Sequence, residues 1–92
     1  MSSREEYVQK MHELLDKLNA EIDSLTKRAE NTGADLREEL AGLRGKQDEA
    51  GTRLAALRTA GEGAWEDLKA GVELAKDAIG EAVESAKSRF QK

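Results

Sequence analysis

The sequence contains no cysteine and no proline, and its only aromatic residues are Tyr7, Trp65 and Phe90. The lack of cysteine excludes disulfides, iron–sulfur clusters and thiolate zinc sites. The lack of proline leaves out the residue that most strongly interrupts a helix. Alanine, glutamate, lysine, leucine and arginine are abundant instead, which is typical of long helices and coiled coils. We therefore predict an all-α fold.

Long apolar stretches are also missing, since no uncharged run exceeds four residues. A membrane-spanning helix needs about 20 consecutive apolar residues, so we expect no transmembrane segment. The first residues lack the apolar stretch of a secretory signal, and we expect a cytoplasmic protein. The formal net charge is −4. Because phosphate binding requires a basic surface, we expect no nucleic-acid partner.

Large apolar side chains are scarce, because much of the hydrophobic fraction is alanine while 37% of the residues are charged. A chain of 92 residues makes at most one domain, and we predict a single helical coiled-coil domain over residues 1–92. Small domains bury little surface. Helices that pair with one another or with a second chain suit this composition better than a large globular core.

Apolar residues recur at steps of three and four along the chain, which is the heptad pattern of packed helices. We call these residues the seam. In the first stretch the seam comprises Val8, Met11, Leu15, Leu18, Ile22, Leu25 and Ala29. In the second it comprises Leu36, Leu40, Leu43, Gln47, Ala50, Leu54 and Leu57.

The order of the steps changes at residues 31–34, Asn-Thr-Gly-Ala. One interpretation is a single long helix over about residues 4–60, with a stutter that locally unwinds the coiled coil. The other is a turn at Gly33, which would give a three-helix bundle. One glycine inside a helix costs only about 1 kcal/mol, so it does not decide between them. We favour the long helix, folded back into an antiparallel coiled coil with a second helix over about residues 64–90.

The third stretch begins after Gly61-Glu62-Gly63, where two close glycines predict a corner between helices. Acidic residues follow the corner and basic residues close the chain, as the helix dipole favours. Its seam comprises Trp65, Leu68, Val72, Ala75, Ile79, Val83, Ala86 and Phe90. This stripe carries an aromatic residue near each end, so it could also bind a membrane interface.

Two segments resemble a known family. They are Gly-Ala-Trp-Glu-Asp-Leu-Lys-Ala-Gly-Val-Glu at residues 63–73, with the closing Ser-Arg-Phe at 88–90, and the heptad stretch over residues 7–25. Together they resemble small bacterial coiled-coil proteins described as similar to a cyanobacterial stress-response protein. The resemblance implies a helical, stress-related protein with no assigned enzyme activity, and it favours the long first helix. It supplies no catalytic or binding residues.

No residue set predicts catalysis. His12 and Asp16 resemble an altered zinc-protease motif, but a zinc site needs further ligands and the chain has no second histidine. We interpret His12 as a surface residue paired with Asp16, and we expect no enzyme activity, metal or cofactor. Gly42, Gly45 and Gly51 allow close helix packing or are tolerated on an exposed face.

The sequence thus predicts a non-enzymatic structural protein that acts through helix–helix association. The expected partner is a second copy or another helical protein. Gln47, a polar residue in the seam, is a candidate for fixing register or oligomeric state. The alternative is reversible binding of residues 64–90 to a membrane or another apolar surface, which we favour less because the chain is acidic.

Overall fold

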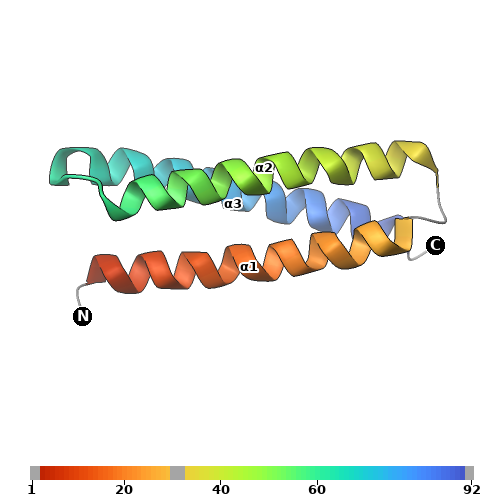
Figure 1. Ribbon diagram of the computed structural model, residues 1–92, viewed down its shortest axis with the longest axis horizontal. Coiled ribbons are helices and arrows are strands. Elements are labelled where there is room, and N and C mark those ends of the chain that lie inside the picture. The colour runs from red at the N-terminus through yellow and green to blue at the C-terminus, as the bar shows by residue number, and fades with distance from the viewer. Residues whose placement is uncertain (1–2, 30–32, 91–92) are drawn as a thin grey trace.

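Three helices run side by side in the computed structural model, which describes residues 3–29 and 33–90 (Figure 1). They are α1 (Ser3–Ala29), α2 (Ala34–Arg58) and α3 (Glu62–Ser88). Neighbours along the chain run in opposite directions, and the bundle measures 47 × 20 × 16 Å. The prediction of an all-α fold is confirmed.

The predicted long helix over residues 4–60 is wrong, and the three-helix alternative describes the chain. Helix α1 ends at Ala29, and Gly33 has extended backbone angles (φ −66°, ψ 159°) directly before α2. Residues 31 and 32 of the predicted break lie outside the described residues. The physical reason is burial, since α2 turns back and covers the seam of α1 without a partner chain. Each buried leucine contributes about 1.5–3 kcal/mol, whereas a backbone hydrogen bond contributes about 1 kcal/mol net.

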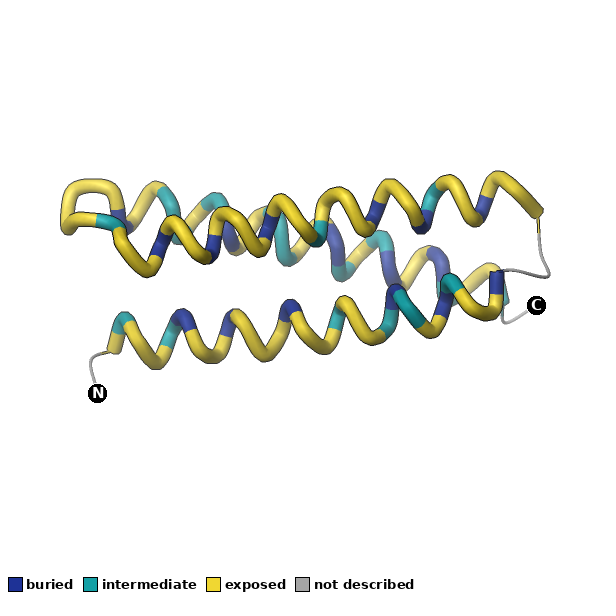
Figure 2. Tube along the Cα trace, in the orientation of Figure 1, coloured by how far each residue is buried: buried dark blue, intermediate teal, exposed yellow. Residues whose placement is uncertain are grey.

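The seam lies inside the bundle (Figure 2). Five predicted seam residues are half-buried: Leu18, Gln47, Leu68, Ala75 and Phe90. The other predicted seam residues of the three stretches are buried: Val8, Met11, Leu15, Ile22, Leu25, Ala29, Leu36, Leu40, Leu43, Ala50, Leu54, Leu57, Trp65, Val72, Ile79, Val83 and Ala86. Among the described residues the core contains no buried polar or charged side chain. The apolar faces of the three helices are therefore buried against one another within a single chain.

The corner between α2 and α3 lies where the glycines predict it, but only one of them forms it. Gly61 precedes the first residue of α3 in an extended conformation (φ −74°, ψ 168°). Gly63 lies in the first turn of α3, because the helix begins at Glu62, earlier than predicted. No described glycine has a positive φ, so the corner does not require glycine geometry.

The two ends of the bundle are held by different interactions. Near the α1–α2 connection, ion pairs link all three helices: Asp23–Arg44 between α1 and α2, Glu21–Lys87 between α1 and α3, and Glu39–Arg89 between α2 and α3. Arg28 also lies over the Phe90 ring, with its Cζ atom 4.5 Å from the ring centroid. Such exposed pairs contribute at most about 1 kcal/mol each, so they mainly fix the register of the helices. The opposite end contains the other two aromatic residues.

Candidate functional site

An aromatic cluster joins the first two turns of α1 to the first two turns of α3. Trp65 is 8% exposed, and the edge of its ring meets Tyr7, with centroids 5.9 Å apart and planes at 70°. The Arg4 guanidinium carbon lies 4.6 Å from the Trp65 centroid, and Lys69 Nζ lies 5.0 Å from that of Tyr7. Both geometries are favourable for cation–π contacts. The cluster closes the end of a core otherwise built from aliphatic residues.

Tyr7 is placed for packing rather than for proton transfer. Burial raises its pKa to about 12, and the negative charge of Glu73 adds to the rise. A general base needs a pKa near the working pH, and Tyr7 stays protonated far above neutral pH. We therefore interpret Tyr7 as a structural side chain.

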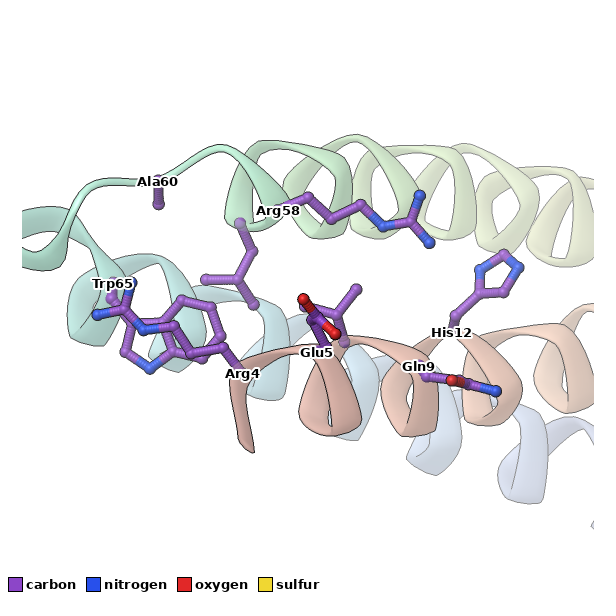
Figure 3. Close-up of a pocket in the computed structure, with 9 residues that line it drawn as sticks. Arg4, Glu5, Gln9, His12, Arg58, Ala60 and Trp65 are labelled. Atoms are coloured by element: carbon purple, nitrogen blue, oxygen red, sulfur yellow. The ribbon is translucent and has the colours of Figure 1, made fainter. Parts of the chain in front are cut away.

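A groove of about 580 Å³ opens beside this cluster, between the start of α1 and the end of α2 (Figure 3). Its volume lies within the range of ordinary ligand pockets. Helix α1 contributes Arg4, Glu5, Val8, Gln9 and His12, α2 contributes Leu57 and Arg58, the corner contributes Ala60, and α3 contributes Trp65. Val8, Leu57 and Trp65 give the groove an apolar floor, and charged side chains form its rim.

Two guanidinium groups give the rim a positive character. The Arg58 side chain extends along the groove toward His12 (Figure 3). Within residues 3–29 and 33–90, Arg58 has no ion-pair or hydrogen-bond partner, and Arg4 lies over the Trp65 ring. Glu5 brings one carboxylate to the rim. The groove is therefore locally basic on a chain whose net charge is −4.

His12 lies at the far end of the groove and contacts Asp16 one turn along α1. Its Nε2 atom is 3.5 Å from Asp16 Oδ2, and both side chains are more than half exposed. No three His, Asp or Glu side chains of the described residues are close enough together to hold a metal ion. The geometry suits an exposed polar pair on a helix surface.

The groove combines residues that the sequence singles out with residues that it does not. Val8, Leu57 and Trp65 belong to the predicted seam, whereas no motif marks Arg4 or Arg58. These two arginines can be recognised as groove residues only once the topology is known. Arg4 lies one turn before Val8, and Arg58 follows Leu57, so antiparallel pairing of α1 and α2 brings both arginines to one end.

Gln47 makes a polar contact across the α1–α2 interface. Its Nε2 atom donates a hydrogen bond to the Leu15 carbonyl oxygen at 2.7 Å. Its Oε1 atom is buried and has no partner among the described residues. This bond opposes sliding of α1 along α2, so Gln47 fixes register inside the chain.

The helix glycines do not serve close packing within this chain. A Cβ atom added at Gly42, Gly45 or Gly51 would meet no atom within 4 Å. Closer helix approach is therefore not the reason for these glycines in the monomer.

No described helix is long and apolar enough to cross a membrane. No protein family, curated protein or solved structure matches this chain.

Proposed function

We propose that the protein is a non-enzymatic helical protein that acts through helix–helix association with a second copy or another helical protein. The observation that carries this proposal is the basic groove beside Trp65. It pairs an apolar floor with the Arg58 guanidinium, which has no partner among the described residues. Buried apolar side chains and well-placed arginines dominate the energetics of protein interfaces. A stress-related role rests on the family resemblance alone.

The burial of the α3 stripe weighs against the membrane alternative. Val72, Ile79 and Val83 are at most 1% exposed, so they could enter a lipid interface only if α3 left the bundle. Such an opening would expose the facing seams of α1 and α2 to water. Vesicle flotation tests this candidate directly, and we expect the folded protein to remain with the soluble fraction.

Site-specific photo-crosslinking in cells tests the proposed function. A photoreactive residue at Gln9, which is exposed in the groove, should give adducts of a few defined masses, detected by mass spectrometry. The matched control carries the same residue at Glu38, exposed near the start of α2 and outside the groove. We expect adducts at position 9 and few at position 38.

Two results would contradict the proposal. One is the absence of any defined adduct at position 9, with or without stress. The other is equal, diffuse labelling at both positions, which would indicate random encounters rather than a binding surface.

A further inference from the structure

One leucine stands out on the outer face of α3. Leu74 is 70% exposed, more than Leu14, the other large hydrophobic residue exposed among those described. Its neighbours one turn away, Ala70 and Ala78, are small and exposed. Residues three and four apart share a helix face, so the Leu74 side chain projects above a shallow alanine surface. An isolated exposed leucine is common on protein surfaces. The charges around Leu74 therefore decide whether it marks a binding surface.

Three acidic residues flank Leu74 along α3, and the Arg53 guanidinium of α2 reaches the Gly71 carbonyl oxygen one turn away. Asp77 lies one turn along α3, and Asp67 and Glu81 lie two turns away on either side. Asp77 Oδ1 is 2.9 Å from Lys76 Nζ. Asp67 and Glu81 have no partner in the part of the chain that the structure describes. We call Leu74 with these three acids the acidic knob.

The groove beside Trp65 has the opposite character. The apolar surface of its floor comes from Val8 and Trp65, which are 6% and 8% exposed, and it suits a branched aliphatic side chain. Its guanidiniums at Arg4 and Arg58 suit carboxylates. The knob therefore matches the groove in both polarity and charge. Complementary potentials of this kind steer association and select the partner.

We infer that the groove of one copy binds the acidic knob of a second copy. Leu74 of the second copy would lie over Val8 and Trp65, and its acids would face Arg58 and Arg4. The inference rests on the proposed function, and it identifies the partner as a second copy of this chain. The groove lies between α1 and α2 while the knob lies on α3, so the contact joins two different surfaces. Such a heterologous contact propagates into chains or closes into a ring.

Sedimentation velocity of the purified full chain, from micromolar to millimolar concentration, tests this inference. We expect the weight-average mass to rise with concentration. Leu74→Ser removes the apolar contact and Arg58→Glu reverses a groove charge. Leu74→Ser should raise the dissociation constant about tenfold or more, the loss expected for one buried leucine side chain. Arg58→Glu should weaken association at least as much, because it brings a carboxylate against the acids of the knob.

Two matched controls separate this surface from general effects of hydrophobicity and charge. Ala41→Ser replaces an exposed apolar side chain of α2 that belongs to neither the groove nor the acidic knob. Arg37→Glu reverses an exposed arginine near the start of α2, at the opposite end from the groove. Both should associate like the natural chain. Circular dichroism should show all four variants folded, since every substituted side chain is exposed.

A mixing experiment tests the heterologous geometry. The Leu74→Ser chain keeps its groove and the Arg58→Glu chain keeps its knob. Each should be monomeric alone, and their mixture should form a one-to-one dimer that grows no further. A natural chain that stays monomeric at every concentration, a mixture that stays monomeric, or controls as weak as the test variants would each overturn the inference. If crosslinking at position 9 in cells then identifies another protein, the proposed function stands while this inference fails.

Discussion

At the scale of single residues, Trp65 is the side chain whose loss should matter most. Its ring is 8% exposed and contacts both Tyr7 and Arg4. Removing a large buried aromatic side chain costs about 3–5 kcal/mol, so we expect Trp65→Ala to lower the free energy of unfolding by that amount. Urea unfolding followed by circular dichroism measures it, with Trp65→Phe as a milder control. A cost near zero would mean that the ring does not close the core.

Gln47 should be a stabilisation site. It makes one hydrogen bond to Leu15, but its second polar atom is buried without a partner among the described residues. A buried unsatisfied group costs about 1–3 kcal/mol, so Gln47→Leu should raise the free energy of unfolding by about 1 kcal/mol. Thermal unfolding measures the change. Gln9→Leu, at an exposed position, should change stability by less than about 0.5 kcal/mol. Destabilisation by Gln47→Leu would show that the hydrogen bond outweighs the unsatisfied atom.

Tyr7 should make stability fall at high pH. Its pKa is about 12 in the folded chain, whereas the ordinary pKa of a tyrosine is 10.0. Below pH 10 both the folded and the unfolded chain hold the proton, so this contribution is fully present. As the pH rises from 10 to 12 the unfolded chain loses its proton first, and the contribution is lost. Melting temperatures across this range measure the fall.

Tyr7→Phe separates this effect from the lysines that titrate in the same range. The variant should lose less stability between pH 10 and 12 than the natural chain. Tyr7 is the only tyrosine, so tyrosinate absorbance reports its titration without ambiguity. A midpoint near pH 10 would contradict the burial of its hydroxyl group.

At the scale of elements, α2 is the helix with the most evident room for improvement. Gly45 lies on its exposed side, and an added Cβ atom would meet nothing within 4 Å. Glycine in a helix interior costs about 0.8–1 kcal/mol relative to alanine, so Gly45→Ala should raise stability by that amount. Gly61→Ala is the control, because alanine is a poor residue before a helix start and should bring no such gain. A Gly45→Ala variant less stable than the natural chain would contradict this expectation, because nothing in the bundle lies near the added Cβ atom.

The elements also show what the sequence could predict. Heptad spacing identifies the buried face of each helix, because burial follows the 3.6-residue period. It does not decide whether the chain turns at Gly33, since a stutter and a turn leave the same apolar positions on the seam. The predicted start of α3 is too late, because Gly63 fits the first turn of a helix as readily as a corner.

At the scale of the whole molecule, the turn decides both the shape and the candidate site. The groove exists only because α2 returns along α1 and brings Arg58 near Arg4. A long helix would separate the same two arginines by about 80 Å, at 1.5 Å per residue. For this reason no local motif in the sequence could have predicted the groove. The groove depends on the direction in which the helices run, and that direction depends on which apolar seams pack together.

Small-angle X-ray scattering should therefore distinguish the two topologies. The bundle is 47 Å long, and its Cα radius of gyration is 14.9 Å. A helix over residues 4–60 would span about 85 Å. At dilution, below the range of self-association, we expect a particle of the shorter dimension.

Thiol crosslinking gives an independent measure of the same topology, because the natural chain has no cysteine to interfere. Asp23 and Arg44 form an ion pair between α1 and α2, so a short bismaleimide should join Asp23→Cys to Arg44→Cys within one chain. In a continuous helix these positions would be about 32 Å apart, beyond the reach of a short crosslinker. An elongated particle together with only intermolecular crosslinks would restore the long helix. A compact particle with an intramolecular crosslink would establish the turn that builds the groove.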